Sequence, residues 1–290
     1  MTTKVSRYVR RTAPFWRELF RQKSALVSFI FLGAVVASAL LAEYVSPYNP
    51  MQIDTQNMLA PPDFPHPFGT DYLGRDILSR VIHGGKVTML AGFSAGAMMT
   101  LIGLLIGLAS GYFGGRLDLL LMRITEVFMT IPILPLLLLL VAIFGSSLTN
   151  VIVVISILSW PTLARIVRAE SMSVVKRDFI MAEVALGAGH RRVIFSHVLP
   201  NITGSAIVYL ALGTAWAILS EAAVDFLGLA PVTVSWGYDL SLALNYWISG
   251  SWWMVFFPGF AIFLTCLSFF LVSDGLNAAL NPTQARRWRV

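Results

Sequence analysis

The chain has 290 residues, of which 57% are hydrophobic and 12% are charged, and its mean hydropathy is +0.74. A water-soluble core of ordinary size does not bury that much apolar surface, so the composition excludes a soluble globular protein and predicts an all-α integral membrane protein. The net charge of +6 comes from basic residues that flank apolar segments, which indicates membrane topology rather than a nucleic-acid partner.

A helix that spans a bilayer needs about 20 predominantly apolar residues. Five uncharged stretches of the chain are near or above this length. These stretches are residues 24–42, 87–115, 127–164, 193–220 and 240–273. The third contains a polar break at 145–150, and we divide it there into two helices joined by a tight outer turn. The sequence therefore predicts six transmembrane helices.

Basic residues predict the orientation, because Lys and Arg near the ends of spans are retained on the cytoplasmic side. Six spans place both termini on one side, and eighteen of the 21 basic residues fall on that side. Only Arg75, Arg80 and Lys86 fall outside. We therefore expect cytoplasmic N and C termini in a bacterial or archaeal cytoplasmic (inner) membrane.

The N-terminal region predicts a membrane anchor. Residues 1–23 form a basic cytoplasmic segment in which Phe15, Trp16 and Phe20 share one helical face, as either an interfacial helix or merely a basic flank. The first span, 24–45, exceeds the roughly 7 to 15 apolar residues of a cleaved secretory signal, so we expect it to be retained.

Residues 46–86 predict an outer segment. Its six prolines exclude continuous helix through the first half. Beyond them, Ile77 and Val81 recur at helical spacing, with Ser79 and Arg80 on the opposite face. We expect a short helix on the outer surface there.

Residues 87–282 predict a core of five further spans, followed by a basic cytoplasmic tail at 283–290. Glycines share one face of the second span, where they allow another helix to approach closely, and we expect that helix to belong to this chain rather than to a second one. They are Gly92, Gly96, Gly103, Gly107 and Gly111. Pro132 interrupts the third span and Pro258 the sixth, and we expect a kink at each.

The sequence contains no pattern typical of catalysis or of a resident cofactor or metal. The four histidines lack metal-ligand spacing, the single cysteine forms no thiol pair, and no nucleophile elbow occurs. Gly84-Gly85-Lys86 resembles a phosphate-binding loop, but Arg80 stands where that loop needs glycine and Val87 where it needs Ser or Thr.

Glu221 and Asp225 are spaced i and i+4 on the fifth span. A helix that starts after Pro200 on the inside brings Glu221 to the outer mouth. We expect the two acids there either as an interfacial acidic rim or as a vestibule that attracts a cationic substrate along the substrate pathway.

The long polar loop at residues 165–200 joins the fourth and fifth spans on the cytoplasmic side. Asp178 begins a run of strong helix formers, and Gly187 suits the left-handed position that ends a helix. Ala188-Gly189 turns the chain, and a second helix leads into the fifth span. A short helix between two spans transmits a displacement to both, so we expect a soluble partner to dock on this loop.

This loop resembles the EAA loop of ABC-importer permeases, written EAA, three residues, Gly, nine residues, Ile-x-Leu-Pro. Gly187 and Leu199-Pro200 match, whereas Met181 replaces the Glu, Glu183 the second Ala and His197 the Ile. The resemblance implies an ATPase-coupling site. It consists of Asp178, Phe179, Met181, Ala182, Glu183, Ala185, Leu186, Gly187, His197, Leu199 and Pro200.

Four other segments are similar to the C-type permeases of dipeptide, oligopeptide and nickel importers. They are residues 15–50, 67–80, 221–237 and 257–282. The resemblance implies the type I ABC-importer permease architecture, in which this chain pairs with a second related permease subunit. It further implies two ATPase subunits that carry ATP and Mg, an extracytoplasmic solute-binding protein and surrounding membrane lipid, with no cofactor on this chain.

By the same resemblance, the expected cargo is a dipeptide or oligopeptide, and nickel chelates, glutathione and sugars are the alternatives within the family. An ATP-independent secondary transporter or channel is the alternative from another class. The spans lack the mid-membrane acids, bases or histidine relays that carry a coupling ion, which argues against that alternative.

Overall fold

A computed structural model describes Leu19 and residues 22–229 and 234–280. The predicted basic segment at 1–23, apart from residues 19, 22 and 23, and the predicted tail at 283–290 lie outside this range. Within it every regular element is a helix, and the only β-bridge joins Thr70 to Asp76. The fold is therefore all-α, as the composition predicts.

Four helical stretches are long and apolar enough to cross a membrane. They are α2 (Lys23–Leu40), α4 (Ile77–Phe113), residues 190–229 around α11 (Leu199–Val224), and α13 (Trp253–Leu280). Two bent pairs pass the same test: α5 (Gly115–Thr130) with α6 (Ile133–Phe144), and α7 (Leu148–Ser159) with α8 (Pro161–Val175). The described residues thus hold four candidate spans, or six if each bent pair is one span.

The breaks between these helices follow local sequence. Ile131 and Pro132 have extended backbone, and α5 and α6 meet there at 89° because a residue before proline is driven away from helical geometry. The polar break at 145–150 ends α6 at Gly145, whose φ is +92°, and the hydroxyl of Ser147 caps α7 by accepting a hydrogen bond from the Asn150 amide at 3.1 Å. Pro258, in contrast, lies inside the unbroken helix α13.

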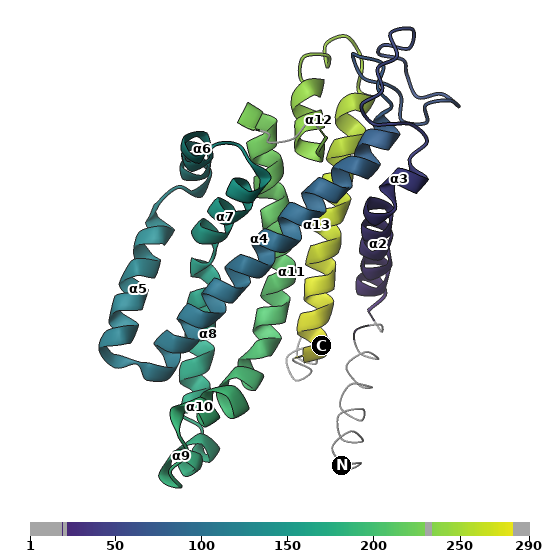
Figure 1. The fold of residues 1–290 in the computed structure, drawn as a ribbon. Coiled ribbons are helices and arrows are strands. Elements are labelled where there is room, and N and C mark those ends of the chain that lie inside the picture. The colour runs from purple at the N-terminus through teal and green to yellow at the C-terminus, as the bar shows by residue number, and fades with distance from the viewer. Residues whose placement is uncertain (1–18, 20–21, 230–233, 281–290) are drawn as a thin grey trace.

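The helices form an elongated bundle with distinct ends, drawn in Figure 1. We call the end that carries residues 46–76 and α12 (Trp236–Ala243) the outer end, after the predicted orientation. α9 (Asp178–Ala185) and α10 (His190–Val193) project at the opposite, inner end, where α2 also begins and α13 finishes. The short α3 (Ala42–Val45) follows α2 at the outer end.

The helix expected on the outer surface after the prolines is not a separate element. Asp76 caps it by accepting hydrogen bonds from the amide and hydroxyl of Ser79 at 2.8 and 2.6 Å, and the helix then runs without a break from Ile77 into the second span as α4. Its polar face is also not exposed, because Ser79 and Arg80 are buried. Likewise, the uncharged stretch at 240–273, predicted as the sixth span, contains the end of α12 and a turn before α13 begins at Trp253.

The glycine face of α4 packs within the chain, as predicted. A Cβ added at Gly96 would lie 2.6 Å from the Thr214 hydroxyl of α11, and one at Gly107 would lie 2.4 Å from the Ala164 carbonyl of α8. The missing side chains let α4 approach both helices closely, which places it at the centre of the bundle (Figure 1).

Candidate functional site

The predicted docking helix exists as α9, and Gly187 ends it. Gly187 has a φ of +85°, its amide donates to the Val184 carbonyl at 2.9 Å, and the Ala188 amide donates to the Glu183 carbonyl at 3.0 Å. This pair of hydrogen bonds is the Schellman arrangement, which requires a left-handed residue at the glycine position. Asp178 is the first residue of the helix and is exposed.

One side chain attaches α9 to the bundle. Ile180 is 2% exposed and packs in a cluster that includes Val167 of α8 and Ile202 of α11. The remaining large apolar side chains of this segment are exposed at the inner tip. They are Phe179, Met181, Val184 and Leu186, of which Leu186 is 87% exposed. An exposed apolar patch on a helix that projects from the bundle is typical of a protein-interaction surface.

Two of the three residues that depart from the EAA pattern, Glu183 and His197, lie together. Oε1 of Glu183 is 3.5 Å from Nε2 of His197, which lies in the π-helical turn η1 (Ile194–Val198). The other carboxylate oxygen, Oε2, is 3.7 Å from the guanidinium of Arg192. The rings of Phe179 and His197 also approach, with centroids 6.1 Å apart. The two polar substitutions thus face each other between α9 and the segment that enters the fifth span.

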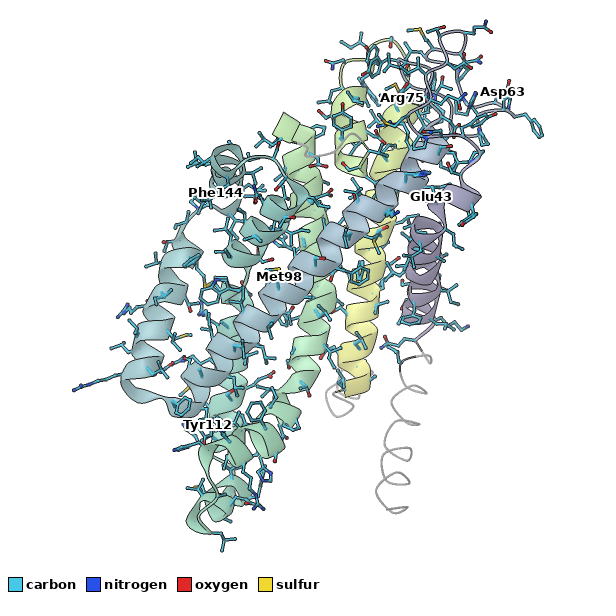
Figure 2. All side chains as sticks on the ribbon, viewed as in Figure 1. Glu43, Asp63, Arg75, Met98, Tyr112 and Phe144 are labelled. Carbon is cyan, nitrogen blue, oxygen red and sulfur yellow. The ribbon has the colours of Figure 1, made fainter. Side chains whose placement is uncertain are left out.

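The loop is also held to the long helix α4. The Tyr112 hydroxyl, near the inner end of α4, is 2.9 Å from Nδ1 of His190 in α10, and Figure 2 shows Tyr112 at this end of the helix. Leu199 and Pro200 form the first turn of α11 directly after η1. A displacement of α9 therefore has direct contact routes into α4, α8 and α11.

A buried charge network at the outer end joins α4 to α12. The Arg80 guanidinium is 1% exposed, and its Nε donates to the Asp239 carboxylate at 2.9 Å and its Nη1 to the Pro50 carbonyl at 3.0 Å. Burial raises the pKa of the Asp239 carboxyl, and the charge of Arg80 opposes that shift. Removing one partner of such a buried pair costs about 3–5 kcal/mol.

The same network folds the loop that precedes α4. The Asp71 carboxylate accepts from the Arg75 amide at 2.9 Å and from its Nε at 2.6 Å. Gly74 has a φ of +76°, and a Cβ there would lie 1.7 Å from the Asp54 carbonyl, so only glycine fits this turn. Figure 2 shows Arg75 among these outer loops, at the far end of the bundle from Tyr112.

Glu221 and Asp225 do reach the outer end, but they form neither an acidic rim nor an open vestibule. Glu221 is 1% exposed and Asp225 is fully buried, because α4 and α12 cover this part of α11. Asp225 accepts a hydrogen bond from the Ser235 hydroxyl, which caps α12. A solute at the outer face cannot contact either carboxylate in this conformation.

Sequence reasoning missed two parts of this arrangement, namely α12 and the pairing of Arg80 with Asp239. A signal for the pairing exists, because a lone arginine in the first turn of an apolar helix needs a buried acid. Nothing in the spacing identifies Asp239 as that acid, since it lies 159 residues along the chain.

Comparison with known proteins identifies the family. Residues 103–286 match the family described as "binding-protein-dependent transport system inner membrane component". The chain belongs to this family. Residues 12–62 of this permease also match the "N-terminal TM domain of oligopeptide transport permease C", which confirms the resemblance to C-type permeases.

Characterised relatives of the permease match it over nearly its whole length. The di/tripeptide transport system permease DppC of Pseudomonas aeruginosa strain UCBPP-PA14 is 38% identical over 276 residues, covering 92% of this chain and 91% of the relative. The dipeptide permease DppC of Bacillus subtilis strain 168 is 35% identical over 95% of this chain and 87% of its own, and the oligopeptide permease OppC of Haemophilus influenzae is 35% identical over 92% and 86%. The permease is therefore a multi-pass inner-membrane transport component.

Proposed function

We propose that this permease is one of two related membrane subunits of an ABC importer that moves dipeptides or oligopeptides into the cytoplasm. The observation that carries the peptide assignment is its match, over about nine-tenths of both chains, to relatives whose names specify di/tripeptide, dipeptide and oligopeptide transport. Nickel chelates, glutathione and sugars are the alternative cargoes.

In this proposal the energy comes from two ATPase subunits that bind ATP and Mg and dock on α9 from the cytoplasm. The exposed apolar side chains of α9 supply the contact surface, and Ile180 anchors the helix to α8 and α11. Closure of the ATPase pair displaces α9, and the contacts of Glu183 with His197 and of Tyr112 with His190 pass the displacement into the spans. A solute-binding protein delivers the cargo at the outer end.

Reconstitution tests the proposal. The permease is co-expressed with its candidate partner permease, ATPases and binding protein, purified as a complex, and assayed in proteoliposomes for uptake of labelled dipeptide and tripeptide with and without ATP. We expect uptake that requires ATP and the binding protein. Transport without ATP would establish the ATP-independent transporter instead, and uptake of a nickel chelate or sugar in place of peptide would correct the cargo.

A further inference from the structure

Glu221 and Asp225, called the acid pair below, are buried side by side. They lie one helical turn apart, where α11 passes into the π-helical turn η2 (Asp225–Leu229). Both carboxylate oxygens of Glu221 and Oδ1 of Asp225 accept no hydrogen bond from the part of the protein that the structure describes. A buried carboxylate without a compensating charge costs several kcal/mol, so this arrangement requires neutralisation.

A third buried polar group, the Thr88 hydroxyl, lies next to the acid pair and could be a further ligand for a cation that neutralises it. Thr88 of α4 is 0% exposed, and its hydroxyl lies beside the Glu221 carboxylate without forming a close hydrogen bond to it or to any other residue that the structure describes. The Ser235 hydroxyl adds a further oxygen next to Asp225. Oxygen atoms from α4, α11, η2 and the cap of α12 thus form a continuous buried row, from Thr88 through the acid pair to Ser235.

The elements packed around the acid pair supply no basic side chain to it. α6 and α7 contain no charged residue, and the sole charge of α13, Asp274, is near its inner end. On α4, Lys86 is exposed, Arg80 already contacts Asp239 of α12, and Nδ1 of His83 is 3.0 Å from the Ser79 carbonyl oxygen. Residues 230–233, between η2 and Ser235, are Ala, Pro, Val and Thr and carry no charge.

The buried carboxylate of Asp239 in α12 differs from the acid pair in having a basic partner. Asp239, which is also buried, is neutralised by Arg80 of the same chain, whereas the acid pair has two carboxylates and no arginine. Two adjacent carboxylates cannot both stay charged unless a cation lies between them. Four oxygens of the buried row remain free, namely both of Glu221, Oδ1 of Asp225 and the Thr88 hydroxyl, because the Ser235 hydroxyl already donates to the other Asp225 oxygen. Ca²⁺ takes about six to eight oxygen ligands and Mg²⁺ about six in octahedral geometry, whereas a single positive charge needs fewer.

We propose that the acid pair binds one monovalent cation, a proton or a sodium ion, held between Glu221, Asp225 and the Thr88 hydroxyl. The bound charge stabilises the junction of α4, α11 and α12, because Asp225 also holds the cap of α12 through Ser235. The packing there is close: a Cβ on Gly237 would lie 2.8 Å from that of Asp225. Separation of these helices at the outer end releases the cation.

The test measures the thermal unfolding midpoint of the assembled importer in lipid nanodiscs. The pH is first varied from mildly acidic to alkaline in a sodium-free choline buffer, and sodium is then added at each pH. The folded wild-type protein binds a cation that the unfolded chain does not, so its unfolding midpoint falls as the proton concentration falls. Restoration by sodium at alkaline pH identifies sodium as an occupant. Without restoration, the infrared band of a protonated carboxyl, absent from a variant that carries both Glu221→Gln and Asp225→Asn, identifies the proton.

Glu221→Gln and Asp225→Asn each remove one negative charge and are both prepared, so that one remains informative if the other does not assemble. We expect the pH and sodium dependence to be weaker in either single variant, which keeps one buried carboxylate, and absent from the double variant, which keeps none. The matched control, Asp239→Asn, leaves Arg80 unpaired, so it lowers the midpoint at every pH but keeps the dependence. Equal pH and sodium dependence in wild type and both amide variants would overturn the proposal.

Discussion

At the residue scale, Gly187 has a left-handed backbone conformation and ends α9, the helix on which the ATPase is proposed to dock. Its φ is +85°, and the space around it is open, since a Cβ built there would meet no atom within 4 Å. A β-branched side chain would therefore be accommodated sterically by its surroundings, but it would strain the backbone by about 1–2 kcal/mol or more. The effect of a substitution at Gly187 reports on the turn itself and not on lost packing.

We predict that Gly187→Val leaves membrane insertion and complex assembly intact but lowers peptide uptake per ATP hydrolysed about tenfold, the equivalent of about 1.4 kcal/mol. Uptake and ATPase activity are measured together in proteoliposomes. Gly189→Ala is the matched control, because Gly189 also has open space around it but has a φ of −69°, which alanine adopts freely. Wild-type coupling in Gly187→Val would refute the role of the turn.

The contact between Glu183 and His197 allows a second test at this scale. Glu183→Ala and His197→Ile each restore one residue of the general EAA pattern and leave the other polar side chain facing an apolar one. Because both side chains are only half-buried, we expect each single change to cost about 0.2–1 kcal/mol of coupling. The double variant restores both residues of the pattern and should recover coupling, as a double-mutant cycle on the ratio of uptake to ATP hydrolysis would show. Strictly additive effects would mean that the two side chains act separately.

At the scale of elements, hydropathy predicts the four long apolar helices, because each one must present apolar side chains to lipid, whereas the other two predicted spans are bent pairs of shorter helices. It also predicts α9 and its end, since Gly187 and the helix formers before it act locally. It does not predict that Ile77 starts a 37-residue helix, because the polar face of that first turn is covered by α12, a contact between distant parts of the chain. Nor does spacing reveal that the acid pair is buried, since α4 and α12 produce that burial.

The glycine face of α4 gives a prediction at the element scale. Gly107→Ala adds a Cβ 2.4 Å from the backbone carbonyl of Ala164, which cannot rotate away, and overpacking of this kind costs about 1–3 kcal/mol. We expect a lower unfolding midpoint and a lower yield of assembled complex. Gly33→Ala in α2 is the control: it meets nothing within 4 Å and gains helix propensity, so its midpoint should equal or exceed that of wild type. Equal stability of the two variants would show that α4 is not held by close packing against α8.

At the scale of the whole molecule, α4 runs from the buried charges at the outer end of the bundle to the loop of α9 and α10 at the inner end. Its first turns carry Arg80 and Thr88, which contact α12 and the acid pair, and its last turns carry Tyr112, which contacts α10. Because α4 is continuous, the proposed movement of α9 and α10 would be linked through one element to the outer junction of α4, α11 and α12. This linkage has functional meaning only if the two ends face opposite sides of the membrane.

Cysteine labelling tests that orientation directly. The native Cys266 is 5% exposed within α13, so it provides a quiet background, whereas Phe64 in the outer segment is 96% exposed and Leu186 at the end of α9 is 87% exposed. We predict that a membrane-impermeant maleimide labels Phe64→Cys in intact cells and labels Leu186→Cys only after the membrane is permeabilised. The reverse pattern would place α9 outside the cell, away from ATP, and would refute its role as the site where an ATPase docks, because no cytoplasmic enzyme would then reach it.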